Sequence, residues 1–178
     1  QHNLKLKPSK LCLFQQELIF LGYKISADGI GTDPEKTRTV LDMAPPRNVK
    51  ELRSTMGCFG YYRRFISSFS QIAEPLFALL RKGEKFIWTS SHQRAFDLLK
   101  TKLASAPVLA LPCDDAQTVL DVDASDSGLG AVLSNVINGE ERPVAYASRT
   151  YNPCEKSYCI TRRELLALIF GLKHFRQY

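Results

Sequence analysis

The chain has 178 residues, which is enough for one or two domains and for a hydrophobic core. Hydrophobic residues make up 44% and charged residues 24%, so collagen, coiled-coil rods and disordered tails are excluded and a soluble folded protein is expected. The net charge is +6, and residues 1–100 carry 16 Lys and Arg against 9 Asp and Glu, whereas residues 101–178 carry 8 against 9. This basic first half indicates either a nucleic-acid partner or a plain solvated basic surface.

Neither a membrane span nor a signal peptide is expected. The longest apolar stretch of the second half covers residues 165–170, far below the roughly 20 residues that cross a bilayer. Residues 1–5 offer no initiator Met and no apolar signal core, so we expect the N-terminus to be cut from a longer protein. The five cysteines are scattered and only three histidines are present, which argues against a zinc site or a disulfide framework and fits a reducing intracellular compartment.

Local signals in the first half predict a β-hairpin followed by helices. Residues 18–25 are rich in β-forming side chains, and the turn signal Ala27-Asp28-Gly29 follows them. Asp33-Pro34 predicts the start of a helix that runs to about Met43. Further helices are expected over about 49–66 with a capping-box-like Asn48 and Glu51, over about 75–82, and from Ser90 or Ser91 to about 104 with Ala95, Phe96, Leu99 and Leu103 on one face.

The helix predicted over 49–66 has two distinct faces. One is an apolar stripe suited to a core, formed by Leu52, Met56, Phe59 and Ile66. The other combines cations, a ring and two glycines: Arg53, Gly57, Gly60, Tyr61 and Arg64. Because a glycine in a helix costs about 1 kcal/mol, we expect it to serve a close approach, either by another helix or by a nucleic-acid backbone.

The pattern changes near residues 105–117. Strands are predicted over 118–123, 128–136 and 143–148, with short polar connections that favour an antiparallel meander. A helix from about Glu155 closes the sequence, and we expect its apolar residues Leu165, Leu168, Ile169, Leu172 and Phe175 to face this sheet.

Two acidic residues occupy positions where burial is expected. Asp123 ends an apolar strand and Glu164 lies beside the apolar stripe of the last helix, so the two carboxylates could share a cation, with Mg²⁺ or Mn²⁺ preferred by oxygen ligands. In the alternative, Glu164 pairs with Arg162, Arg163 or another surface cation, and Asp123 merely begins a turn. Asp121 and Asp126 are weaker candidates for the same site.

Eight motifs in one order resemble the polymerase polyprotein of gypsy-type LTR retrotransposons over essentially all 178 residues. They are FLGYKIS at 20–26, DPEK at 33–36, ELRS with MG at 51–57, YYRRFI at 61–66, APVL at 106–109, DAS at 123–125, GAVL at 130–133 and ELLA at 164–167. The resemblance implies an α+β chain in which a palm-type β-hairpin and a helical thumb-like region precede a truncated ribonuclease H-like sheet with one long helix. Its expected parts are residues 1–30 (end of the reverse-transcriptase palm), 31–104 (thumb and connecting helices) and 105–178 (start of the ribonuclease H-like domain).

The same resemblance assigns roles to individual residues. Phe20, Leu21, Gly22 and Tyr23 match the element that positions the primer terminus, and the helix with Arg53, Gly57, Tyr61 and Arg64 matches the one along the minor groove of the template–primer duplex. Asp123 and Glu164 match carboxylates of a two-metal site, with Mg²⁺ or Mn²⁺, that hydrolyses RNA in an RNA·DNA hybrid. The implied partners are the hybrid, the template–primer duplex and the rest of the polyprotein, with no membrane.

The resemblance also implies what this chain lacks. No Tyr-x-Asp-Asp motif is present and the further ribonuclease H acids are not found, so we expect an internal fragment with neither active site complete. The implied location is intracellular and cytoplasmic, in a virus-like particle or with access to the nucleus. Two alternatives stay open: a catalytically dead or host-adopted nucleic-acid-binding remnant, and a purely structural interaction domain.

Overall fold

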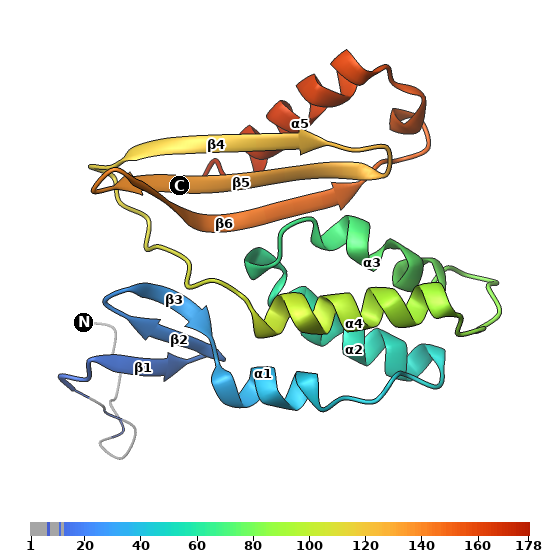
Figure 1. Cartoon of the computed structure of the whole chain (residues 1–178), viewed down its shortest axis with the longest axis horizontal. Coiled ribbons are helices and arrows are strands. Elements are labelled where there is room, and N and C mark those ends of the chain that lie inside the picture. The colour runs from blue at the N-terminus through green and yellow to red at the C-terminus, as the bar shows by residue number, and fades with distance from the viewer. Residues whose placement is uncertain (1–6, 8–10, 12) are drawn as a thin grey trace.

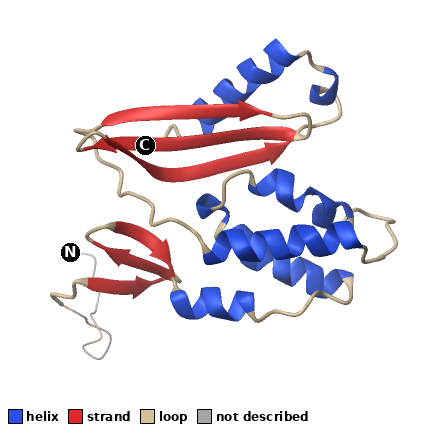
Figure 2. Ribbon diagram, in the orientation of Figure 1, coloured by secondary structure: helices blue, strands red, loops and turns tan. Residues whose placement is uncertain are grey.

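The computed structural model describes residues 7, 11 and 13–178, so the beginning of the palm-type segment expected at 1–30 lies partly outside the described residues. A small three-stranded sheet and a helical region lie on one side of the molecule, and a larger three-stranded sheet with one long helix lies on the other (Figures 1 and 2). This arrangement confirms the expected α+β order. Within the described residues, no helix combines the length and the apolarity that crossing a membrane requires.

The N-terminal sheet is an antiparallel meander of three short strands. They are β1 (Glu17–Phe20), β2 (Tyr23–Ser26) and β3 (Gly29–Thr32). The turn at Ala27-Asp28 agrees with the prediction, but the strand expected over 18–25 is interrupted by a second turn at Leu21-Gly22. Both residues have positive φ, 49° and 78°. A leucine rarely adopts this conformation, so Gly22 is the one local signal for this turn.

The first two helices begin at the predicted caps. The Asp33 carboxylate accepts the Glu35 amide at 3.0 Å at the start of α1 (Pro34–Leu41), and Asn48 accepts the Glu51 amide at 2.9 Å at the start of α2 (Val49–Tyr61). The predicted extension of α2 to Ile66 is wrong, because the chain bends after Tyr61 into the 3₁₀ turn η2 (Arg63–Phe65). The bend places Tyr62, Phe65 and Ile66 in the core, so tertiary packing overrides the helical pattern.

The next helix begins earlier than expected. Helix α3 (Phe69–Ala78) contains Pro75 inside it, although the sequence suggested a helix starting there and running to Lys82. Burial of Phe69, Ala73 and Leu76 stabilises the helix despite the hydrogen bond that proline removes. Helix α4 (Ser90–Ala104) is capped by Thr89 with His92 rather than by Ser90 or Ser91, and all four residues of its predicted apolar face are buried. Helices α1–α4 therefore share one hydrophobic core.

The second sheet confirms the predicted antiparallel meander. Its strands β4 (Gln117–Ala124), β5 (Gly128–Ile137) and β6 (Glu140–Thr150) pair in sequence order and extend slightly beyond the predicted limits. The β5–β6 turn is formed by Asn138 and Gly139, both with positive φ.

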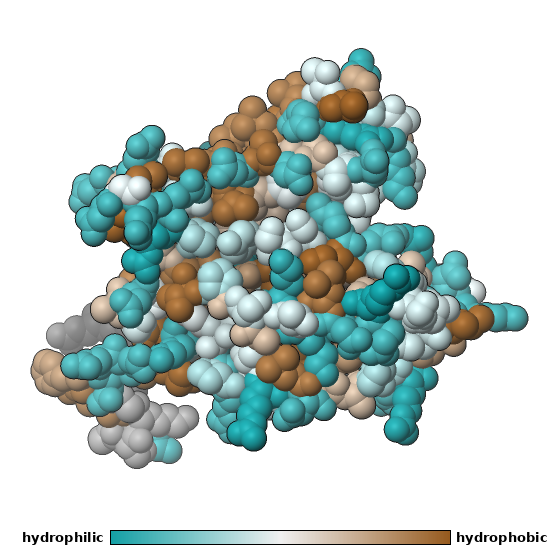
Figure 3. All heavy atoms as spheres, viewed as in Figure 1, coloured by the Kyte–Doolittle hydropathy of each residue, from teal (hydrophilic) through white to brown (hydrophobic). Residues whose placement is uncertain are grey.

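The last helix, α5 (Ile160–His174), covers one face of this sheet (Figure 1), but with a different side from the one predicted. Ala167, Gly171 and Phe175 are buried, whereas Leu165, Leu168, Ile169 and Leu172 are between 40% and 58% exposed. A Cβ on Gly171 would lie 3.2 Å from Leu120 and Val122, so small side chains let the helix approach closely. Of the predicted face, Phe175 alone is buried in the core that includes the sheet, and apolar atoms are visible on the surface of this part of the molecule in Figure 3.

The predicted start of this helix at Glu155 is also wrong, because Glu155 belongs to a separate 3₁₀ turn, η3 (Glu155–Ser157). The Glu155 carboxylate is buried and accepts two hydrogen bonds from Arg149, at 2.6 and 2.8 Å, and one from the Asn152 amide at 2.9 Å. This bidentate pair ties the end of β6 to the segment that leads into α5.

Replacement of Glu155 by glutamine is expected to lower the free energy of unfolding by about 2 kcal/mol at pH 7, because Arg149 loses a charged, hydrogen-bonded partner. The Arg149 hydrogen bond holds the pKa of Glu155 below its ordinary value of 4.5, against the opposing effect of burial. The contribution is therefore complete above about pH 4.5 and is lost as the pH falls through the lowered pKa. Urea unfolding of wild type and Glu155→Gln at pH 7 and at a pH below the lowered pKa measures this contribution. A difference in unfolding free energy between the two proteins that does not change with pH would contradict it.

The helical region and the second sheet are joined by specific contacts. Arg149 of β6 lies over Phe170 of α5, whereas the neighbouring Ser148 contacts α3, so α3 and α5 lie on opposite faces of the sheet. The Ser70 amide donates to Ser148 Oγ at 2.9 Å, and Ser70 Oγ donates to the Ser148 carbonyl at 2.8 Å. A β-bridge between Ile30 and Leu109 connects the two sheets through the linking segment.

Candidate nucleic-acid groove and metal site

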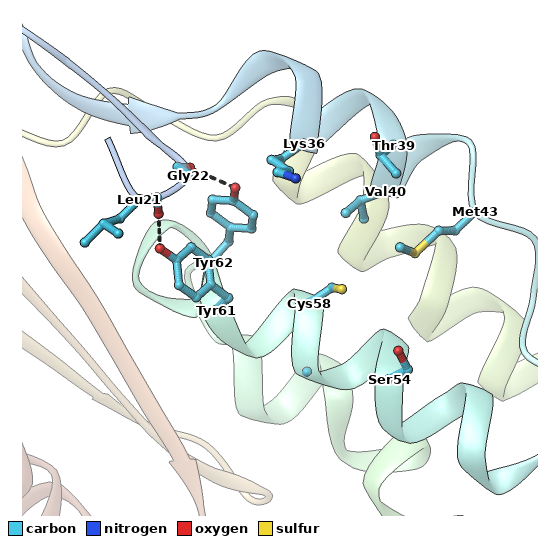
Figure 4. Close-up of a pocket in the computed structure, with 11 residues that line it drawn as sticks. Leu21, Gly22, Lys36, Thr39, Val40, Met43, Ser54, Cys58, Tyr61 and Tyr62 are labelled. Atoms are coloured by element: carbon cyan, nitrogen blue, oxygen red, sulfur yellow. Dashed lines mark hydrogen bonds between the residues drawn. The ribbon is translucent and has the colours of Figure 1, made fainter. Parts of the chain in front are cut away.

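An open groove of about 830 Å³ lies between the β1–β2 turn, α1 and α2 (Figure 4). We call it the turn–helix groove. Its surface is mainly apolar, and Lys36 of α1 contributes a cation. The residues that line it are Leu21, Gly22, Lys36, Thr39, Val40, Met43, Ser54, Gly57, Cys58, Tyr61 and Tyr62.

Tyrosines at the end of α2 fix the β1–β2 turn in place. Tyr61 donates its hydroxyl to the Leu21 carbonyl, and Tyr62 donates to the Gly22 carbonyl at 2.8 Å (Figure 4). Tyr23 stacks on Tyr61 with ring centroids 5.1 Å apart. Burial, with a smaller contribution from the charge of Asp33, raises the pKa of Tyr62 to about 12, so its hydroxyl stays a neutral donor at physiological pH. The turn and the helix therefore form one wall of the groove.

The glycines of α2 leave open space. A Cβ added to Gly57 or Gly60 would meet nothing within 4 Å. Among the described residues, no helix packs against these positions, so the helix-packing alternative for this face is not observed there. Gly57 lines the groove, and Tyr61, which also lines it, is 46% exposed. Within the part of the chain that the structure describes, nothing covers this face.

The predicted nucleic-acid residues fall into three groups. The groove is lined by Leu21, Gly22, Gly57 and Tyr61. Tyr23 does not line it but stacks on the Tyr61 ring. Arg53 and Phe20 are exposed but do not line the groove.

Arg64 lies elsewhere, which corrects its placement on the same face. The chain bends after Tyr61, and the Arg64 guanidinium donates to the Val144 carbonyl at 3.5 Å and to the Tyr178 hydroxyl at 3.3 Å. Its Nε is buried and has no partner among the described residues. Arg64 thus connects the helical region to the second sheet.

Sequence reasoning also missed groove residues. Ser54 and Cys58 share the spacing of three and four residues with Gly57 and Tyr61, so helical periodicity could have identified them. Lys36 and Thr39 come from another helix, and no local signal associates them with α2.

The expectation that Asp123 and Glu164 are buried is wrong, because both are exposed. Leu120 and Val122 contact Gly171 of α5, so alternation along β4 directs Asp123 to the other face of the sheet, together with Asp121. Glu164 lies in α5, two turns before Gly171. Each acid is therefore exposed to solvent and lies outside the packed interface between α5 and the second sheet.

Tyr151 connects the two acids electrostatically. Burial raises the pKa of its hydroxyl, the charge of Arg163 lowers it, and the charges of Glu164, Asp123 and Asp126 raise it further. Both carboxylates therefore act on the same hydroxyl, although Asp123 leaves β4 on the face opposite to α5, which carries Glu164. Arg163 pairs with Asp126 at 2.8 Å, so the alternative pairing of Arg163 with Glu164 is not observed.

The donor chemistry fits part of a metal site. Carboxylate oxygens are the ligands that Mg²⁺ and Mn²⁺ prefer. No group of three or more His, Cys, Asp or Glu residues that could hold a metal ion occurs within residues 7, 11 and 13–178. Asp123 and Glu164 can supply two ligands of such a site.

Comparison with known families decides the identity of the second half. Residues 88–178 match the model of the RNase H-like domain found in reverse transcriptase, which is more than half of the chain. The chain belongs to this family of RNase H-like domains found in reverse transcriptase. The match begins before the boundary expected at 105 and includes α4, whose apolar face packs into the core of the helical region.

The relatives of this reverse-transcriptase chain are Pol polyproteins, which confirms the retrotransposon resemblance. It is 37% identical over 187 residues to the retrovirus-related Pol polyprotein from transposon opus of Drosophila melanogaster, covering 99% of the chain and 19% of the relative. It is 38% identical to that from transposon 297 of the same organism (99% and 16%) and 36% identical to the transposon Tf2-3 polyprotein of Schizosaccharomyces pombe (99% and 13%). The chain spans less than a fifth of the length of each of these relatives.

Two solved structures share the fold of this reverse-transcriptase chain. The foamy viral protease-reverse transcriptase dRH in complex with ds DNA has a TM-score of 0.81 and 28% identity, covering 92% of this chain and 29% of that one. The foamy viral protease-reverse transcriptase in complex with RNA/DNA hybrid has a TM-score of 0.80 and 28% identity, covering 93% and 23%.

Proposed function

We propose that this part of Pol holds the template–primer duplex in the turn–helix groove and contributes Asp123 and Glu164 to a ribonuclease H site. The parent enzyme would carry out RNA-directed DNA synthesis and metal-dependent hydrolysis of RNA in RNA·DNA hybrids. The observation that carries the proposal is the groove itself, in which Tyr61 ties the β1–β2 turn to a helix whose Gly57 faces open space.

The chemistry of the groove suits a duplex backbone. A glycine and a tyrosine ring offer a smooth apolar surface for sugars, and Lys36 with the exposed Arg53 on the adjoining helix can approach phosphates. Such contacts do not distinguish base sequence, which is what a copying enzyme requires. Solved relatives of similar fold are complexes with ds DNA and with an RNA/DNA hybrid, which supports the same partners here.

Asp123 and Glu164 would hold Mg²⁺ or Mn²⁺ together with ligands from elsewhere in Pol. When bound, such ions activate a water molecule and stabilise the leaving 3′ oxygen. The chain's own contribution is to present two charged carboxylates at one end of the second sheet. Because the described residues offer no third ligand near them, we expect the isolated chain to cleave a hybrid slowly or not at all.

Binding of an RNA·DNA hybrid to the full chain, measured by fluorescence anisotropy between about 50 and 250 mM KCl, tests the groove. We expect affinity to fall steeply with salt, and Lys36→Gln and Arg53→Gln each to reduce the slope of log K against log salt by about 1. Lys85→Gln, in the loop before α4 and outside the groove, is the matched control and should leave the slope unchanged. Equal slopes for all three variants would contradict the proposed groove.

A further inference from the structure

Arg163, in the first turns of α5, contacts three segments at the end of the sheet where the two acids lie. Its Nη1 donates to Asp126 Oδ1 at 2.8 Å, and its Nη2 donates to the Lys156 carbonyl at 2.9 Å. The guanidinium carbon lies 5.3 Å from the centroid of the Tyr151 ring. One side chain thus joins α5 to the β4–β5 turn, to η3 and to the end of β6.

These contacts differ from an ordinary surface ion pair. The Arg163 side chain is only 17% exposed, and its Nε is buried without a partner among the described residues. Its partner Asp126, by contrast, is fully exposed, so the anchors of Arg163 are the Lys156 carbonyl and the Tyr151 ring. The planar guanidinium donates one hydrogen bond to a carboxylate and one to a carbonyl from different segments, so both the position and the orientation of the Arg163 side chain are restrained. An isolated exposed pair, by contrast, contributes little because each side chain stays mobile.

The segments that Arg163 joins are adjacent to both acids. Glu164 follows it directly in α5, and Asp126 comes three residues after Asp123. The turn that carries Asp126 is itself held by hydrogen bonds, since Ser125 Oγ accepts the Gly128 amide at 3.2 Å and the Ser125 amide donates to the Gly128 carbonyl at 3.0 Å. Arg163 therefore links α5, which carries Glu164, directly to the β4–β5 turn, which follows Asp123.

We propose that Arg163 is a positioning residue that sets the separation of the Asp123 and Glu164 carboxylates. It does so without binding a metal, by holding the start of α5 against the β4–β5 turn. The inference rests on the proposed metal site, because a fixed separation matters when both carboxylates hold the same ions.

The neighbouring Arg162 provides a matched control. It is exposed, and its guanidinium carbon lies 6.0 Å from the centroid of the Tyr158 ring, in the segment just before α5. Loss of its charge therefore changes the net charge as much as loss of Arg163 does, without removing a link to the turn.

The test compares the full chain with its Arg163→Gln, Arg163→Lys and Arg162→Gln variants by NMR. Mn²⁺ is titrated, and the broadening of signals near Asp123 and Glu164 gives its affinity. We expect Arg163→Gln to weaken Mn²⁺ binding by about tenfold, as changes next to metal ligands commonly do. Lysine has a single ammonium and cannot reproduce the fork, so Arg163→Lys should lie between wild type and Arg163→Gln, while Arg162→Gln should match wild type.

A second readout does not depend on metal. Nuclear Overhauser contacts from the Tyr151 ring to residues flanking Asp123 and Glu164 should weaken in Arg163→Gln and persist in Arg162→Gln. If they persist in Arg163→Gln, or if Mn²⁺ affinity is the same in that variant and wild type, the positioning role is overturned. If wild type does not bind Mn²⁺ at all, the proposed metal site fails, and the Tyr151 contacts alone decide whether Arg163 sets the geometry.

Discussion

Replacement of Gly57 by alanine is expected to stabilise the protein and to weaken its binding to a duplex. The added methyl group meets no atom within 4 Å, and alanine is favoured over glycine in a helix by about 1 kcal/mol. The same methyl group projects into the turn–helix groove, where it would hold a duplex backbone away from α2. We expect about a tenfold loss of affinity, equivalent to about 1.4 kcal/mol, from anisotropy titrations with an RNA·DNA hybrid.

Gly60→Ala is the matched control for this result. Gly60 also lies in α2 and its Cβ would also meet open space, but it does not line the groove. Thermal unfolding should show a higher melting temperature for both variants than for wild type. Only Gly57→Ala should bind the RNA·DNA hybrid more weakly. Equal affinities for the two variants would show that the duplex does not contact α2 at Gly57.

Loss of either acid is expected to remove most of the divalent-metal binding of the chain. Asp123→Asn and Glu164→Gln each replace a charged oxygen ligand by a neutral amide, and we expect each to lower Mn²⁺ affinity by about tenfold or more. Because both side chains are exposed, the free energy of unfolding should change by no more than about 0.5 kcal/mol. Isothermal titration calorimetry with MnCl₂ and urea unfolding measure the two quantities.

Glu140→Gln controls for net charge, since Glu140 begins β6 at the end of the sheet opposite to Asp123. Its effect on Mn²⁺ affinity should be small. If Glu140→Gln lowers affinity as much as Asp123→Asn does, the metal is attracted by overall charge, and the two acids do not form a site.

The sequence predicted best those features that local chemistry determines. Asp33 and Asn48 cap helices through hydrogen bonds to amides two and three residues away, so a short stretch of sequence contains all the information needed. The exposed face of α5 was mispredicted for the opposite reason. Large apolar residues suggested one buried face, yet the close approach of Gly171 to Leu120 and Val122 selects another, and that choice depends on the partner sheet.

The groove was predictable in part. Gly57 and Tyr61 are four residues apart in α2, so helical periodicity predicts that they share a face. Both line the groove in the structure. Arg64 was lost from that face because burial of Phe65 and Ile66 bends the chain after Tyr61. Lys36 reaches the groove through packing between helices, which helical periodicity within one segment cannot reveal.

We expect one duplex to lie in the groove between the β1–β2 turn and α2. The most direct test is to map the amide chemical-shift changes of the full chain on addition of an RNA·DNA hybrid. We expect the largest changes at residues 21–23, 36–43 and 53–61. Changes confined to α3 and α4, with the groove residues unaffected, would show that the duplex binds elsewhere.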